Sequence, residues 1–90
     1  MSKAIITVVG KDKVGIIAKV CTYLAEKEIN IYDISQTIVQ EYFNMMMIVD
    51  ASKILNQFEI VSNELESLGN EIGVTIKIQH EEIFNRMHRI

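Results

Sequence analysis

Two short segments combine polar residues and a glycine at spacings that could hold a small charged molecule. The first contains Asp12, Gly15 and Ile16, just before and within a predicted helix. The backbone N–H groups of Gly15 and Ile16 would lie at the start of that helix, which is a favourable place for a carboxylate or another anion. Gly15 has no side chain, so an anion could approach the backbone closely.

The second segment follows that helix and contains Asn30, Ile31 and Asp33. An ammonium group needs carboxylates or carbonyl oxygens, and the side chains of Asp12, Asn30 and Asp33 are candidate acceptors. The same residues also have structural explanations, because aspartate caps helices and asparagine tolerates left-handed turns. Spacing alone favours these structural roles, so a ligand site needs support from the rest of the chain.

Three other groups of reactive side chains are interpreted as structural. His80 and His88 are eight residues apart, whereas two metal ligands share one side of a helix at a four-residue step, so no metal is predicted. Consecutive strand residues point to opposite faces, so the run Met45–Met47 is expected to pack rather than to hold a copper ion. Cys21 lies on the apolar side of a predicted helix without an activating base, and we expect it to be buried.

No catalytic activity is expected. A small hydrolase of this size, such as an acyl-phosphate hydrolase, needs an anion cradle with a guanidinium group. The arginines are Arg86 and Arg89, both in the last ten residues, and the first loop has only lysines.

The composition is that of one globular domain, with 90 residues, 49% of them hydrophobic and 23% charged. Nine lysines and arginines oppose twelve aspartates and glutamates, which gives a formal net charge of −3. This balance disfavours binding to nucleic acids and to anionic membranes, because both attract basic surfaces. A single cysteine fits a reducing compartment and no signal peptide is recognised, so we expect a cytoplasmic protein without a cofactor.

The order of elements follows from hydrophobic periodicity and turn residues. The first strand is apolar on both faces and is expected to break at Gly10, after which Asp12 would cap the first helix. Irregular alternation in the second strand predicts a bulge. The predicted elements are strand 4–9, helix 14–27, strand 29–40, a turn at Glu41–Tyr42, strand 43–50, helix 56–72, strand 74–79 and helix 81–89.

The second helix has clear start and stop signals. Asn56 is expected to cap it, with Glu59 reaching back to the same turn. Gly73 is expected to end it. Gly69 lies inside the helical pattern, where glycine costs about 1 kcal/mol relative to alanine.

This βαββαβ order predicts an α+β fold of the ferredoxin-like type, a four-stranded antiparallel sheet with two helices on one face, followed by a short C-terminal helix. The two helices leave the other face of the sheet uncovered, and Met46 and Ile48 would lie on it. An exposed apolar surface of this kind is typical of an interface. We therefore expect a homodimer or a larger homo-oligomer.

Over Lys3–Gln79 the chain resembles the ACT-domain family of regulatory modules. The first loop, Gly10–Ile17, is similar to the Asp-x-Pro-Gly turn that opens the first helix of the family, although Val14 stands where many members have proline. Asn30-Ile31 at the start of the second strand and Asp50 at the end of the third also match.

The ending Phe84–Ile90 is similar to the tail of stand-alone single-ACT proteins of bacteria. Those proteins are related to the ACT regions of the glycine-cleavage-system transcriptional repressor. The resemblance implies an ACT domain over residues 1–80 and a helical extension of the same domain over residues 81–90.

The resemblance implies a non-enzymatic module that senses an amino acid at a homo-oligomer interface. ACT ligands typically lie between the first loop of one subunit and the second strand of another, so the implied binding residues are Asp12, Gly15, Ile16, Asn30, Ile31 and Asp33. The signal would pass to a separate effector protein or through assembly itself. ACT domains also serve purely for assembly, so a ligand-independent protein-interaction module is the alternative.

Overall fold

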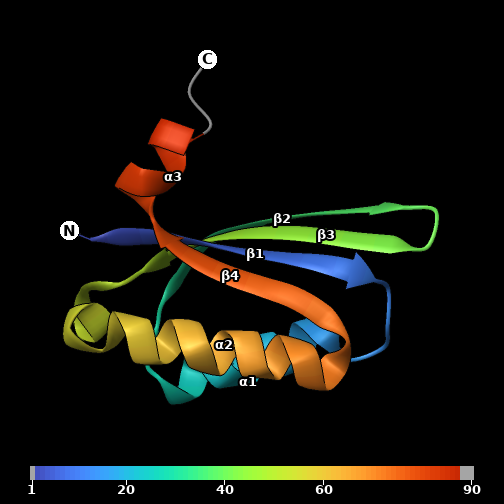
Figure 1. Ribbon diagram of the computed structural model, residues 1–90, viewed down its shortest axis with the longest axis horizontal. Helices are drawn as coiled ribbons and strands as arrows, with labels where there is room; N and C mark the ends of the chain where they lie inside the picture. Colours follow the sequence, from blue (N-terminus) through green and yellow to red (C-terminus); the bar gives the residue numbers. More distant parts are fainter. Residues whose placement is uncertain (1, 88–90) are drawn as a thin grey trace.

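The computed structural model describes residues 2–87 as a four-stranded sheet with two long helices on one face (Figure 1). The strand order is β2-β3-β1-β4, and every neighbouring pair is antiparallel. The predicted ferredoxin-like fold is therefore confirmed. The elements are β1 (Lys3–Lys11), α1 (Ile16–Glu26), β2 (Ile31–Val39), β3 (Tyr42–Asp50), the 3-10 helix η1 (Ser52–Gln57), α2 (Phe58–Ile72), β4 (Val74–His80) and α3 (Glu81–Met87).

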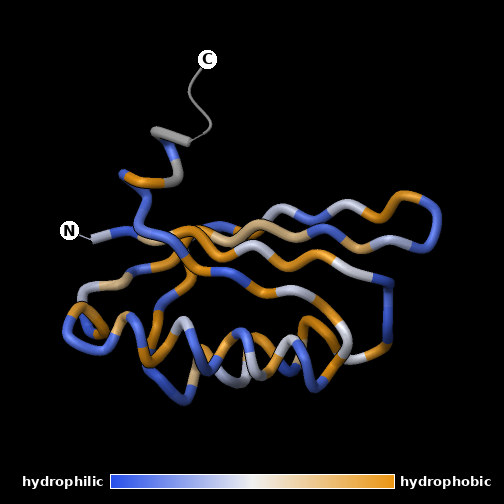
Figure 2. Tube along the Cα trace, viewed as in Figure 1, coloured by the Kyte–Doolittle hydropathy of each residue, from blue (hydrophilic) through white to orange (hydrophobic). Residues whose placement is uncertain are grey.

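The hydrophobic core lies between the sheet and the helices α1 and α2. Alternate residues of β1, β3 and β4 point into it, and hydrophobic positions alternate with hydrophilic ones along β4 in Figure 2. Met45 and Met47 are fully buried there, whereas Met46 is 39% exposed on the other face, which confirms the predicted alternation of the methionine run. The helices contribute Ile16, Val20 and Leu24 from α1 and Val61 and Leu65 from α2.

Strand β1 is longer than predicted and does not break at Gly10. Gly10 pairs with Phe43 of β3 and with Val74 of β4, so both neighbouring strands hold its backbone in the sheet. The break comes only after Lys11. The hairpin turn is likewise shifted by one residue, to Gln40–Glu41, and the predicted bulge in β2 is present between Ile31 and Asp33.

The second helix does not begin at Asn56, which lies inside η1. The carboxylate of Asp50 accepts hydrogen bonds from the N–H (3.0 Å) and the hydroxyl (2.5 Å) of Ser52, and this contact turns the chain into η1 before Asn56 is reached. Helix α2 then begins at Phe58 without a side-chain cap. The predicted end is confirmed, because Gly73 follows the helix in the left-handed conformation at φ 82°.

Helix α3 lies on the opposite side of the sheet from α1 and α2 (Figure 1). It begins at Glu81 as predicted and is described to Met87, so the predicted end at Arg89 lies outside the described residues. In the part of the chain from residue 2 to residue 87, no helix is long and apolar enough to span a membrane.

Candidate functional site

The residue at the N-cap of α1 is not the one predicted. Gly15 is the N-cap residue, with φ 91°, a conformation that favours glycine. Asp12 does not cap the helix, because its backbone N–H donates a hydrogen bond to the carbonyl of Glu41 at 2.8 Å and continues the sheet past the end of β1. Asp12 is exposed beside this turn.

The partial positive charge at the N-terminus of α1 is not offset by a side chain of its cap or first turn. Gly15 has no side chain to cap the helix, and no acidic residue lies in the first turn. Lys13 and Lys19 line the same small hollow as Gly15 and Ile16, with Glu71 as the acidic member of its lining. The hollow measures about 230 Å³, slightly less than a typical small-molecule site, so a second wall would be needed to enclose a ligand.

The second predicted segment lies at the far end of the sheet. The carbonyl of Asn30 accepts the N–H of Asp50 at 2.8 Å, and Asp50 pairs with Lys3 at the start of β1. Gly15 follows Lys11, the last residue of β1. The eight steps from Lys3 to Lys11 span roughly 26 Å at about 3.3 Å per residue, so one chain does not bring the two segments together.

The bulge in β2 also separates the residues of the second segment. Ile31 pairs with Val49 and packs against the core on the helix side. Asp33 is placed opposite Ile48, on the face away from the helices, where its carboxylate accepts the N–H of Ile34 at 2.9 Å. Asp33 thus lines a separate hollow of about 100 Å³ with Ser35, Met46 and Ile48.

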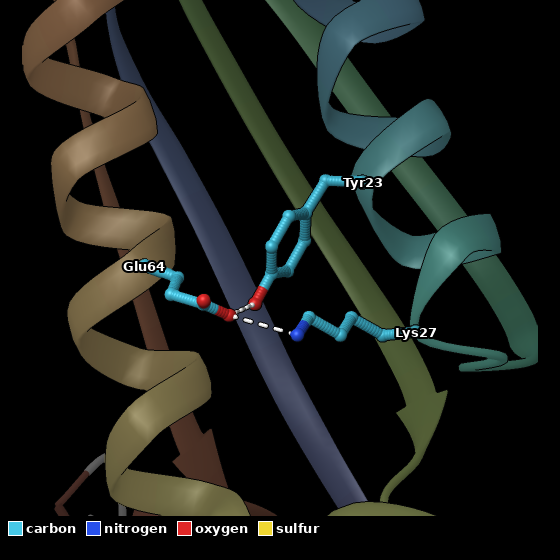
Figure 3. Close-up of polar contacts among 3 residues, drawn as sticks. All are labelled: Tyr23, Lys27 and Glu64. Carbon is cyan, nitrogen blue, oxygen red and sulfur yellow. Dashed lines mark hydrogen bonds and ion pairs between the residues drawn. The ribbon is translucent and has the colours of Figure 1, made fainter.

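A polar bridge between α1 and α2 was not predicted from the sequence. Figure 3 shows Tyr23 and Lys27 pointing toward Glu64 of α2. The Tyr23 hydroxyl donates to the Glu64 carboxylate at 2.6 Å, and the Lys27 ammonium lies 3.2 Å from the same oxygen. The four-residue step from Tyr23 to Lys27, opposite a helix rich in glutamate, was the signal available in the sequence.

This bridge shifts the pKa values of Tyr23 and Glu64. Burial, with the hydrogen bond to Glu64, raises the pKa of Tyr23 well above its ordinary value. The hydroxyl of Tyr23 and then the ammonium of Lys27 lower the pKa of the Glu64 carboxyl. Beside the bridge runs a groove of about 450 Å³ in which Ile60 and Leu68 supply apolar surface.

A second polar cluster lies where β1, β2 and β3 meet. The Lys3 ammonium is 5.8 Å from the centre of the Tyr32 ring. The N–H and hydroxyl of Ser52, together with the Tyr32 hydroxyl, lower the pKa of Asp50. Asp50 therefore has a structural role, because its hydrogen bonds to Ser52 fix the start of η1.

The other reactive side chains have structural surroundings. His80 stacks on Phe58 with ring centroids 3.9 Å apart, and His88 lies outside the described residues. Cys21 is half-buried against the core rather than fully buried. Within residues 2–87, no three His, Cys, Asp or Glu side chains are grouped so as to hold a metal ion.

Curated relatives cover the full length of the chain. A UPF0237 protein of Bifidobacterium longum is 60% identical over 90 residues, which is 100% of both chains. A UPF0237 protein of the archaeon Methanococcus maripaludis is 53% identical over 90 residues, again 100% of both. Similar chains are therefore found in archaea as well as in bacteria.

Solved structures and a family model agree with these relatives. An ACT domain protein from Streptococcus pneumoniae is 49% identical, with a TM-score of 0.82 over 92% of this chain and 93% of that one. A candidate glycine cleavage system transcriptional repressor shares the fold at 21% identity, with a TM-score of 0.74 over 88% of this chain and 45% of that one. The family model for the ACT domain matches residues 2–79. The chain belongs to the ACT domain family.

Proposed function

We propose that this chain is a non-enzymatic regulatory module that binds a free amino acid between two of its copies. The observation that carries the proposal is the start of α1, where Gly15 leaves the helix without a side-chain cap beside Lys13 and Lys19. A helix start of this kind favours a carboxylate. Membership of the ACT family supports an amino acid as the source of that carboxylate.

The edge of the sheet at β2 offers a way to complete the site. Ile34 and Ile38 point to the helix side but are 42% and 53% exposed, because α1 and α2 do not cover this edge. Residues 31–39 contain no proline, lysine or arginine, the residues that commonly block edge pairing. Antiparallel pairing of two β2 strands, about a two-fold axis perpendicular to the sheet, would bury these isoleucines.

The same pairing would reverse the second copy end for end. The loop at Gly15 in one copy would then lie toward the Asn30 end of the other, whereas within one chain the two segments lie at opposite ends of the sheet. In the proposed site the N–H groups of Gly15 and Ile16 bind the carboxylate, and Asp12 with the second copy's Asn30 accepts the ammonium. Ile31 adds apolar surface, and Asp33, on the other face, acts only as a long-range charge.

The test is a thermal-shift screen of the twenty amino acids, with light scattering after size exclusion on the same sample. A ligand at 100 times its dissociation constant stabilises the native protein by about 2.7 kcal/mol. Asn30→Ala should weaken the selected ligand by about ten- to a hundredfold, because it removes a hydrogen bond to a charged group. Asn56→Ala, at an exposed position of η1, is the matched control and should bind normally.

A ligand-independent assembly module is the second candidate. It is favoured by the exposed isoleucines of β2 and by the exposed Met46 on the other face of the sheet. If the protein is oligomeric but no amino acid raises its melting temperature, the sensor is overturned and the assembly role takes its place. The output of the module would pass to a separate effector protein or through assembly itself. The single cysteine supports a reducing, cytoplasmic location.

A further inference from the structure

Helices α1 and α2 lie side by side on one face of the sheet (Figure 1), and their outward side is hollowed. One hollow of about 450 Å³ is lined mainly by α2, and a second of about 300 Å³ is lined mainly by α1. Tyr23 and Leu68 line both hollows, so the two form one continuous surface, the helix groove. Leu68, the Tyr23 ring and Ile60 supply its apolar floor, and the side chain of Ile60 is 55% exposed.

The charged residues that line the helix groove are mostly acidic. They are Glu26, Glu64 and Glu71, with Lys19 as the basic member of the lining. Glu64 is paired with Lys27 at 3.2 Å, whereas neither Glu26 nor Glu71 forms an ion pair with another described residue. Helix α2 adds to the negative field, since its sequence contains four glutamates and no lysine or arginine. A groove with this balance favours a positively charged partner.

Glu26 and Glu71 lie toward opposite ends of the helix groove. Gly15 and Ile72 line a common hollow, so the start of α1 lies beside the end of α2. Glu71 is next to the last residue of α2, whereas Glu26 is the last residue of α1. Lys19 lines the hollow at Gly15 together with Glu71, and Glu26 lies roughly 10 Å further along α1 at about 1.5 Å per residue. Two basic groups about two helical turns apart would therefore meet both carboxylates.

We propose that the helix groove binds an amphipathic α-helix of another protein, with apolar residues along one side and lysines or arginines two turns apart beside them. Both walls of the groove are helices whose backbone groups are paired internally, so an extended peptide would find no main-chain partners there. A helix satisfies its own backbone and buries its apolar side on Ile60 and Leu68. The bound helix would belong to the effector protein, an assignment that rests on the regulatory role proposed above.

The helix groove also adjoins the proposed amino acid site. Lys19 and Glu71 line the hollow at Gly15 as well as the groove. A partner helix in the groove would therefore touch residues that line the amino acid site. This contact gives the module a direct route from its ligand to its effector.

The probe for the test is a synthetic amphipathic peptide of about 18 residues, above the length at which isolated helices are marginal. It carries leucines along one side and lysines two turns apart beside them. Titration into isotope-labelled protein, followed by amide chemical shifts, should give saturable changes confined to the helix groove. A matched peptide with glutamate in place of each lysine should bind about tenfold more weakly or worse. No shifts, shifts on the other face of the sheet, or equal binding of the two peptides would overturn the proposal.

Ile60→Arg tests the groove from the side of the protein. The change removes apolar surface and adds a like charge, so it should raise the Kd of the lysine peptide by about tenfold or more. Ile83→Arg is the matched control, because Ile83 is 48% exposed but lies on α3, on the opposite side of the sheet. Circular dichroism shows whether both variants are folded. An unchanged Kd in I60R would contradict docking in the groove, and a lower mass of I60R in sedimentation would assign the groove to a second copy instead.

Amino acid binding is measured on Ile60→Arg in parallel. Ile60 lines neither the hollow at Gly15 nor the β2 edge, so this variant should keep the ligand response of the wild type. Peptide binding by a protein that responds to no amino acid would overturn the sensor but not the groove. An amino acid response without peptide binding would overturn the groove alone.

Discussion

Gly69→Ala gives a direct test of the packing of α2 on the sheet, because two effects on stability have opposite signs. In an isolated helix the substitution is favourable by about 1 kcal/mol, since alanine forms helices better than glycine. In this fold, however, Gly69 is buried against β4. A Cβ atom at this position would lie 2.6 Å from the carbonyl oxygen of Val74 and 3.1 Å from the side chain of Ile76.

The nearest obstacle is backbone, so it cannot move aside as a flexible side chain would. Helix α2 must retreat from β4 by about 0.5–1 Å, and a gap of this size forfeits a quarter to a half of the dispersion energy of the contacts it opens. Overpacking of this kind costs about 1–3 kcal/mol, and contact with backbone places the cost near 3 kcal/mol. After the helical gain of about 1 kcal/mol, the net loss is about 2 kcal/mol.

The assay is urea denaturation followed by circular dichroism, with thermal melts at the same protein concentration. For a domain of this size, a loss of about 2 kcal/mol lowers Tm by roughly 8–16 °C. Asn70→Ala is the control, because Asn70 is the next residue of the same helix but is exposed; it should be slightly stabilising. A Gly69→Ala variant as stable as the wild type, or more stable, would refute the close approach of α2 to β4.

Three further predictions follow from other parts of the structure. The stabilisation from the Glu64 carboxyl, whose pKa is lowered by Tyr23 and Lys27, is present above the ordinary carboxyl pKa and is lost as the pH falls through the lowered value. The urea midpoint of the wild type should therefore fall more steeply in acid than that of Glu64→Gln. Leu65→Ala, at a fully buried position, should cost about 2–5 kcal/mol in urea denaturation. Ile34→Lys, on the exposed β2 edge, should weaken the edge dimer in sedimentation experiments while leaving the Tm of the monomer unchanged.

The elements of the fold could be predicted because their signals are periodic and local. The alternation around Met45–Met47 and the glycine stop at Gly73 depend only on neighbouring residues, and both are confirmed. The predicted helix caps at Asp12 and Asn56 were wrong, because the hydrogen bonds that decide where the helices begin involve residues outside those local segments. Asp12 is held by Glu41 across the sheet, and η1 is set by Asp50 before Asn56 is reached.

The candidate site was harder to predict, because its geometry depends on strand register. The sequence identifies Gly15 and Asn30 as polar or glycine positions at the ends of elements, but only the pairing of Lys3 with Asp50 shows that they lie at opposite ends of the sheet. The face on which Asp33 lies depends on a bulge of one residue, since a single shift moves a strand side chain to the other side.

The distribution of polar groups explains why assembly is central to the proposed function. Among the side chains that the structure describes, none that is polar or charged is buried in the core, so the interior supplies packing but no recognition. The groups able to recognise a ligand or a second copy lie at the ends of strands and on the β2 edge. The helix start at Gly15 and the segment at Asn30 are each half of the proposed site, and one chain holds them at opposite ends of the sheet. A two-fold axis at the β2 edge would bring the two halves together, so a variant that blocks pairing at this edge should lose amino acid binding even when its fold and all six proposed ligand residues are intact.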